Sequence, residues 1–154
     1  MQRVVVVGPG GAGKTFVAER LSERTGIPVI YLDRIFWRSE WRPTPRGEAV
    51  TELERALTAD RWIVDGNFLD AGDTRFQKAD TVIFLDLPRS LCIARIVWRR
   101  VRDRGQERPD LPAPEGLDWE FIKWTWRYPH ELRLPNVVHL RSRREVAEMI
   151  RTVG

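Results

Sequence analysis

The chain has 154 residues, of which 42% are hydrophobic, and a formal net charge of +4. This length supports one hydrophobic core and is too short for two ordinary domains, so we expect a single domain over residues 1–154. No apolar run approaches the roughly 18 residues of a membrane span, and there is no signal-peptide layout. The composition therefore predicts a cytoplasmic protein without a membrane partner.

The positive charge comes almost entirely from arginine, because Lys14, Lys78 and Lys123 are the only lysines. The planar guanidinium group suits phosphate, which occurs in nucleotides and in nucleic acids alike. Charge alone therefore leaves both kinds of partner open.

Five short apolar runs are predicted as strands, and longer segments with helical spacing separate them. The runs are RVVVV (3–7), PVIYL (28–32), RWIVD (61–65), TVIFLD (81–86) and NVVHL (136–140). Strands that alternate with helices indicate a parallel sheet covered on both faces. We therefore expect an α/β three-layer sandwich with a five-stranded parallel sheet.

The stretch GPGGAGKT, from Gly8 to Thr15, directly follows the first predicted strand and fits two phosphate-binding patterns. As G-x-G-x-x-G it is the turn of a dinucleotide-binding Rossmann fold, with Asp33 about 20 residues further on for a ribose hydroxyl. As G-x-x-x-x-G-K-[ST] it is a P-loop, or Walker A motif, at the start of a helix. Only the second pattern explains Lys14 and Thr15, so the P-loop is favoured.

A P-loop holds the phosphates of a nucleoside triphosphate in a nest of backbone N–H groups at a helix N-terminus. Lys14 supplies a cation for the β- and γ-phosphates, and the Thr15 hydroxyl is a ligand for Mg²⁺. The sequence thus predicts ATP and Mg²⁺ as cofactors. The expected nucleotide-binding residues of the loop are Gly8, Gly10, Gly11, Ala12, Gly13, Lys14 and Thr15.

The rest of the chain narrows the class of P-loop protein. Neither the N-K-x-D nor the D-x-x-G string of GTPases occurs. The residue pattern resembles the adenylate kinase and shikimate kinase branch of P-loop kinases over nearly the whole chain. It is most similar to kinase-like proteins known as DNA topology modulation proteins of the FlaR type, through IYLDRIFW (30–37), RWIVDGNF (61–68), ADTVIFLDLPRSLCIARIVWRR (79–100) and EFIKWTWRYP (120–129).

Two aspartates that end strands are candidates for the metal. Asp65 precedes Gly66 at the expected carboxyl edge of the sheet, where open α/β folds bind ligands. The resemblance to the D-G-x-P turn of nucleotide kinases implies that Asp65 holds the Mg²⁺ water shell or faces the transferred phosphoryl group. Asp86 is the rival, but Pro88 suits a first helical turn, which favours helix capping for Asp86.

Arg95, Arg99 and Arg102 are spaced i, i+4 and i+7, so they share one helical face. Like charges on one face repel one another, which indicates an anion among them; a solvated basic face is the alternative. The resemblance to adenylate kinases implies that this arginine run leads into a lid over ATP. The arginines that match the run are Arg95, Arg99 and Arg100, of which one would lie against the adenine and another on the terminal phosphates. The proline-rich segment 104–116 would form a short lid.

The acceptor side carries fewer signals. Asp33 follows the second strand, where shikimate-type kinases keep an acidic residue near the accepting hydroxyl, so Asp33 is a candidate base. The segment at about 34–59 is expected to be helical and to lie beside the acceptor. For Trp37 and Trp41, packing and ring stacking are equally plausible, and Arg127 is an open candidate for a further cation.

Two further segments carry signals: one follows the last predicted strand, and the other follows the expected lid. The turn after the last strand resembles the backbone turn that brackets adenine in this branch, which nominates Arg141 and Ser142. Trp119, Ile122 and Trp126 repeat at i, i+3 and i+7 and are predicted to form a core stripe.

The leading hypothesis is an ATP- and Mg²⁺-dependent kinase that moves a γ-phosphoryl group to a small, anionic acceptor, with nucleotides as the favoured class. Lys14, Asp65, Arg95, Arg99 and Asp33 are its predicted catalytic residues, and Thr15 and Asp65 its metal ligands. The alternative is an ATP-binding regulatory protein associated with nucleic acid, without kinase turnover. A dinucleotide-binding Rossmann protein is the remote alternative.

Overall fold

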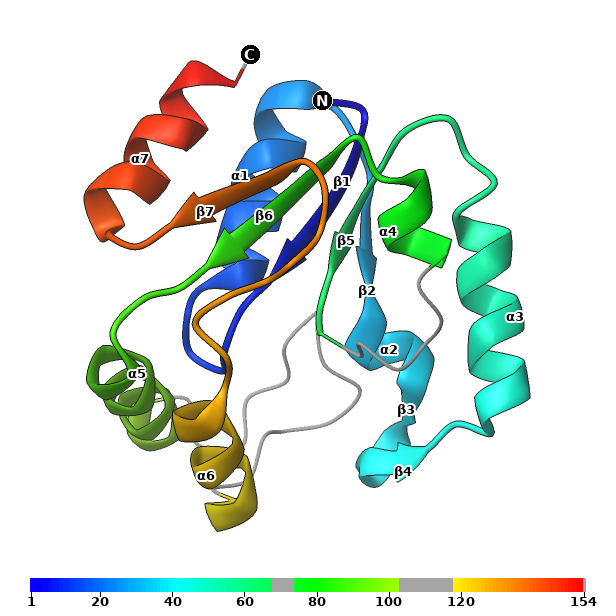
Figure 1. Cartoon of the computed structure of the whole chain (residues 1–154). Coiled ribbons are helices and arrows are strands. Elements are labelled where there is room, and N and C mark those ends of the chain that lie inside the picture. Colours follow the sequence, from blue (N-terminus) through cyan, green and yellow to red (C-terminus); the bar gives the residue numbers. More distant parts are fainter. Residues whose placement is uncertain (68–73, 103–117, 154) are drawn as a thin grey trace.

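Figure 1 shows the computed structural model of the chain, in which residues 1–67, 74–102 and 118–153 are described. Its centre is a sheet of five parallel strands in the order β2-β5-β1-β6-β7. The strands are β1 (Arg3–Val7), β2 (Val29–Tyr31), β5 (Trp62–Asp65), β6 (Thr81–Leu85) and β7 (Val137–Leu140). The predicted α/β class is confirmed, and each strand begins and ends within one residue of its predicted bounds.

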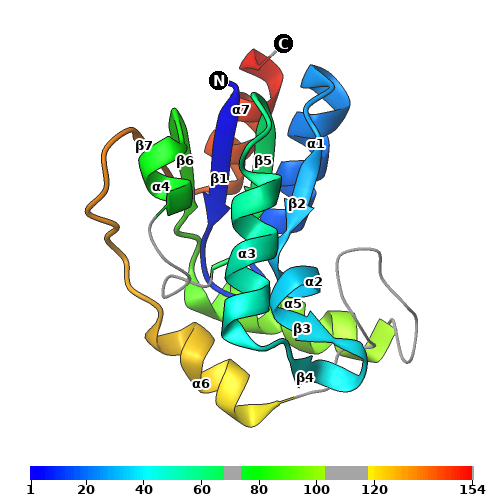
Figure 2. The same cartoon turned by 90° about the vertical axis from the view of Figure 1, so that its right-hand side faces the viewer.

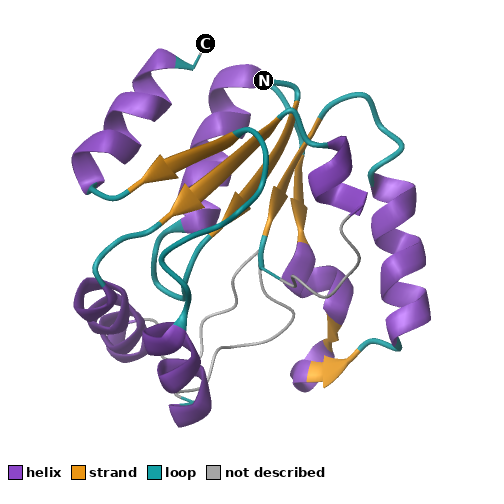
Figure 3. Cartoon of the chain, in the orientation of Figure 1, coloured by secondary structure: helices purple, strands orange, loops and turns teal. Residues whose placement is uncertain are grey.

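Helices cover both faces of this sheet and extend beyond its carboxyl edge, as Figures 1 and 3 show. The helices are α1 (Lys14–Thr25), α2 (Leu32–Phe36), α3 (Arg46–Ala56), α4 (Thr74–Lys78), α5 (Arg89–Arg102), α6 (Trp119–Arg127) and α7 (Arg143–Thr152). Among the described residues, no helix is both long and apolar enough to cross a membrane.

The central strand β1 explains why two layers of helices are needed. Side chains alternate along a strand, so Val5 and Val7 pack in one core cluster with α2, α3 and α4. Val4 and Val6 pack in the other cluster with α1 and α7. All four valines are buried, so both faces of the sheet require an apolar cover.

The segment 34–59 is helical only in part. After α2, strands β3 (Trp37–Arg38) and β4 (Arg42–Pro43) form an antiparallel hairpin around a 3-10 turn, and α3 follows. The rings of Trp37 and Trp41 pack edge to face with centroids 6.0 Å apart. Pro43 lies in β4 and Pro45 is the N-cap of α3, so neither proline stands in a helix interior, where its missing N–H group would cost a hydrogen bond.

The predicted core stripe on α6 is wrong for its two tryptophans. Ile122 is buried, but the exposed fractions of Trp119 and Trp126 are 66% and 60%. The helix instead buries the face that carries Ile122 and Thr125. Periodicity alone identified an apolar face but could not identify which face meets the protein, because α6 packs against α5 beyond the edge of the sheet. Figure 2 shows α5 and α6 together at this end of the molecule.

Candidate active site

The glycine-rich stretch forms the loop between β1 and α1 at the carboxyl edge of the sheet. Gly13 is the N-cap of α1 and has a left-handed backbone, with φ of +93°. Gly11 also has a positive φ, and a Cβ atom there would lie 2.2 Å from the carbonyl oxygen of Cys92 in α5. Both positions therefore require glycine, and the loop places the N-terminus of α1 at the site, where backbone N–H groups attract anions.

Lys14 and Thr15 begin α1 and meet the end of β5. The Thr15 hydroxyl donates a hydrogen bond to Asp65 Oδ2 at 2.7 Å. Lys14 Nζ donates to the Pro9 carbonyl oxygen at 3.0 Å. Burial lowers the pKa of the Lys14 ammonium group, and the nearby Asp65 and Asp33 carboxylates oppose this shift. The half-buried Lys14 ammonium group therefore lies beside two carboxylates at the N-terminus of α1.

The oxygens of Thr15 and Asp65 suit a magnesium ion. Mg²⁺ prefers oxygen ligands and is commonly bound through one or two protein groups, with water and substrate phosphates completing its shell. No group of three or more His, Cys, Asp or Glu side chains within the described ranges is arranged to hold a metal. The hydroxyl of Thr15 and the carboxylate of Asp65, in direct contact beside the P-loop, are oxygen donors of the kind that this ion takes.

One cavity of about 1030 Å³ unites most of the predicted residues. Asp33, from the first turn of α2, lines it from the β2 side, and Arg95 and Arg99 line it from α5. Arg95 Nη1 also donates to the Gly11 and Ala12 carbonyl oxygens at 3.3 and 3.5 Å, which holds α5 against the P-loop. The predicted residues that line this cavity are Gly10, Gly11, Ala12, Gly13, Lys14, Thr15, Asp33, Asp65, Arg95 and Arg99.

Other predicted residues lie apart from the cavity lining. Arg100, Arg127 and Arg141 are exposed and are not among its lining residues. Ser142 is the N-cap of α7, and its side chain accepts a hydrogen bond from the Glu145 backbone N–H. The expected lid at 104–116 lies outside the described residues.

The P-loop is also held by a contact that the sequence does not predict. Asn67, which follows β5, accepts hydrogen bonds through Oδ1 from the Gly8 backbone N–H at 3.1 Å and from the Tyr128 hydroxyl at 2.9 Å. Tyr128 is buried where the chain leaves α6. The sequence carries no signal for this contact, because 61 residues separate the two side chains.

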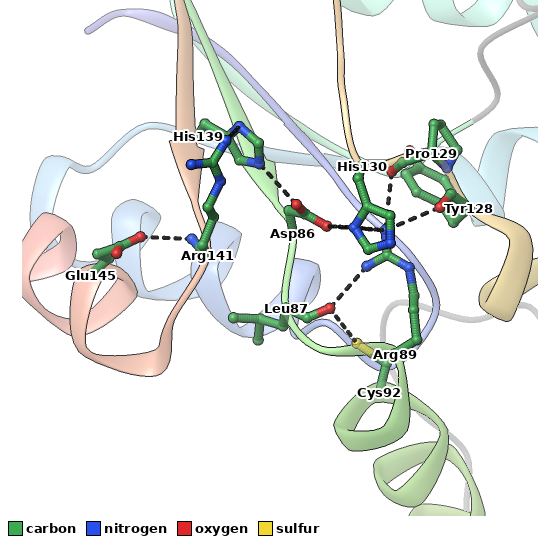
Figure 4. Close-up of polar contacts among 10 residues, drawn as sticks. All are labelled: Asp86, Leu87, Arg89, Cys92, Tyr128, Pro129, His130, His139, Arg141 and Glu145. Carbon is green, nitrogen blue, oxygen red and sulfur yellow. Dashed lines mark hydrogen bonds and ion pairs between the residues drawn. The ribbon is translucent and has the colours of Figure 1, made fainter.

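Asp86 is engaged by side chains and does not line the cavity, so the structure places it apart from the metal-ligand position for which it was a rival (Figure 4). Its carboxylate accepts from Arg89 at 3.0 Å and contacts His130 at 2.8 Å and His139 at 3.1 Å. Buried Arg89 also donates to the Tyr128 carbonyl oxygen. This cluster therefore joins the end of β6, the start of α5, the exit from α6 and β7.

Comparisons with known proteins place this geometry among P-loop proteins. A family model described as isopentenyl transferase matches residues 1–83. An adenylate kinase from Mycobacterium leprae (strain Br4923) is 36% identical over 108 residues, which cover 68% of this chain and 58% of the relative. The chain therefore spans less than two thirds of the length of that relative.

Solved structures show the same fold. A gluconokinase from Sinorhizobium meliloti 1021 superposes with a TM-score of 0.62 at 20% identity, covering 97% of this chain and 87% of that chain. A shikimate kinase from Acinetobacter baumannii, solved in complex with shikimate, has a TM-score of 0.59 at 15% identity, covering 99% of this chain and 90% of that chain. The fold is thus that of P-loop kinases.

Proposed function

Because this chain belongs to the P-loop proteins that the isopentenyl transferase family model describes, and to the adenylate kinase and shikimate kinase-like branch of P-loop kinases, we propose that it is an ATP- and Mg²⁺-dependent kinase. Its reaction moves the γ-phosphoryl group of ATP to a small, anionic acceptor, with nucleotides as the favoured class. The observation that supports it best is the contact of Thr15 with Asp65 in a cavity that also holds Lys14, Asp33, Arg95 and Arg99.

Kinase activity is preferred over isopentenyl transfer for a specific reason. The family match ends at residue 83, before the arginine-bearing helix α5 begins. Arg95 and Arg99 of that helix line the same cavity as the P-loop. Guanidinium groups placed there suit the charge that spreads over the phosphoryl oxygens in a loose transition state.

Each of these residues has a separate role in the phosphoryl transfer. A bond forms between an acceptor oxygen and the γ-phosphorus, the bond to the β,γ-bridging oxygen breaks, and ADP leaves. Lys14 and the N-terminus of α1 hold the phosphates, and Arg95 and Arg99 stabilise the equatorial oxygens. A hydroxyl acceptor would pass its proton to Asp33, whereas a phosphate acceptor needs no base. Mg²⁺ held by Thr15 and Asp65 would neutralise charge on the phosphate oxygens.

A screen of acceptors tests this proposal. ADP release from ATP and Mg²⁺ is measured with nucleoside monophosphates, nucleosides, sugars and aromatic acids, beside a blank without acceptor. We expect one class to raise the rate at least about tenfold over the blank, and Lys14→Met to abolish both turnover and tight ATP binding.

Lys123→Met is the matched control, because Lys123 is exposed on α6 and pairs with Glu120. It should keep the parent's rate. Equal ADP release with and without every acceptor would indicate an ATPase. Unchanged ATP affinity in Lys14→Met would refute the site itself.

A further inference from the structure

We propose that Trp98 forms the stacking face for the base of the donor nucleotide, an inference that rests on the proposed kinase function. Trp98 lies on α5 and lines the P-loop cavity, yet 64% of its surface is exposed. An indole ring left open to solvent in the wall of a cavity is available to a flat ligand. Aromatic side chains bind bases in this way because every base presents a π-face.

The position of Trp98 on its helix matches the layout of a nucleotide. Arg95, Trp98, Arg99 and Arg102 are spaced i, i+3, i+4 and i+7, so they share one face of α5, and all four line the cavity. Arg95 is held at the P-loop by the Gly11 and Ala12 carbonyl oxygens. At 1.5 Å of rise per residue, Trp98 lies about 4.5 Å further along the helix axis. In a nucleotide the ribose separates the base from the phosphates. A stacking ring for the base must therefore lie near the phosphate-binding groups but not among them, as Trp98 does.

The surroundings of Trp98 assign it to the donor rather than to the acceptor. Helix α7 lines the same cavity with three apolar side chains (Val146, Ala147 and Ile150) and with Arg143 and Arg151. Helix α7 follows β7 at one edge of the sheet, whereas Asp33 follows β2 at the opposite edge. Figure 1 shows α5 and α7 on one side of the molecule and α2 and α3 on the other. The α7 end, where apolar side chains lie between arginines, therefore suits the base, and the Asp33 end is left for the acceptor.

Two other candidates for the stacking face are already engaged. The guanidinium group of Arg20 lies over the Phe16 ring, 5.3 Å from its centroid. Arg95 donates to the Gly11 and Ala12 carbonyl oxygens, which keeps its guanidinium group at the phosphate end of the cavity. In the part of the chain that the structure describes, the Trp98 ring has no aromatic or cationic partner. Trp98 is therefore the open ring at this end of the cavity.

The test compares a ligand that has a base with one that lacks it. Binding of ATP and of inorganic tripolyphosphate, each with Mg²⁺, is measured by calorimetry for the parent, Trp98→Ala, Trp98→Phe and Trp119→Ala. Trp119 is the matched control, because it is as exposed as Trp98 but does not line the cavity. Melting temperatures establish that each variant is folded.

We expect Trp98→Ala to weaken ATP binding at least about fivefold, with tripolyphosphate binding unchanged within about twofold. Trp98→Phe should recover most of the loss, and Trp119→Ala should match the parent. Equal ATP affinity in Trp98→Ala and the parent would overturn the inference while leaving the kinase intact. Equal weakening for both ligands would also overturn it, because the effect would then lie in the phosphate site or the fold. A parent that does not bind ATP would refute the kinase proposal and this inference together.

Discussion

The Thr15 hydroxyl donates to Asp65 Oδ2 at 2.7 Å and so joins the first turn of α1 to the end of β5. The two residues are 50 positions apart in the chain and meet because β1 and β5 are parallel neighbours in the sheet, with Val6 paired to Asp65. A hydroxyl and a carboxylate fixed in this way beside Lys14 form a small oxygen site at the mouth of the P-loop.

Asp65→Asn should weaken the binding of ATP at least about tenfold when Mg²⁺ is present, because a neutral amide is a poor ligand for a hard cation. In EDTA the variant should bind ATP at least as tightly as the parent, because it no longer places a carboxylate near the phosphates. Titration calorimetry under both conditions measures the difference. Asp60→Asn, in the exposed loop before β5, is the control and should behave as the parent. Equal losses with and without Mg²⁺ would argue against a metal site at Asp65.

Tyr128→Phe should lower the free energy of unfolding by about 1 kcal/mol at pH 7, because it removes the hydrogen bond to Asn67. Burial raises the pKa of Tyr128 to about 12, whereas the phenol ionises near its ordinary value of 10 in the unfolded chain. As the pH rises from 10 to 12, ionisation of the Tyr128 phenol therefore stabilises the unfolded state of the parent. Tyr128→Phe has no phenol and does not lose stability in this way. The difference between parent and variant should shrink above pH 10.

Urea denaturation at several pH values measures this difference. Tyr31→Phe is the control, because Tyr31 is half-buried and its hydroxyl donates to Glu19 Oε1 over a longer distance of 3.3 Å. A difference between parent and Tyr128→Phe that stays constant up to pH 12 would show that the phenol does not remain protonated in the folded protein.

Asp86→Asn should lower the free energy of unfolding by roughly 3–5 kcal/mol at pH 7, because Arg89 keeps its buried charge and loses its anionic partner. Burial alone would raise the pKa of Asp86, but hydrogen bonds from His130, His139 and Arg89 outweigh it and hold that pKa below its ordinary value of 3.8. The carboxylate therefore stabilises the fold above that ordinary value, and this contribution is lost as the pH falls through the lowered pKa.

Denaturation from pH 8 to pH 2 checks the Asp86 prediction. The difference between parent and Asp86→Asn should shrink below about pH 4. Glu131→Gln is the control. It removes an exposed ion pair in which Glu131 Oε2 lies 3.9 Å from Arg133 Nη2, and it should change the free energy of unfolding by less than about 0.5 kcal/mol. A difference that persists unchanged at pH 2 would contradict the assignment of the effect to the carboxylate.

Much of the fold was predictable because its signals are local. Each strand is a short apolar run, and burial on both faces of a parallel sheet requires such runs. The P-loop was predictable for a similar reason, since a tight loop and a helix N-terminus need glycines and a Lys-Thr pair at fixed spacing. On α6 the same reasoning was wrong, because Trp119 and Trp126 have apolar periodicity but lie exposed on a helix that packs beyond the sheet.

The sequence by itself determined the α/β class, the position of the P-loop and the strand-ending aspartates, because each depends on residue types within one short segment. Only the tertiary structure decided which of these residues meet. It brought Asp65 within hydrogen-bond distance of Thr15. It also surrounded Asp86 with Arg89, His130 and His139, and it placed Trp98 in the wall of the cavity. These contacts depend on strand order and on how helices pack over the sheet edge, and a single chain carries no local signal for either.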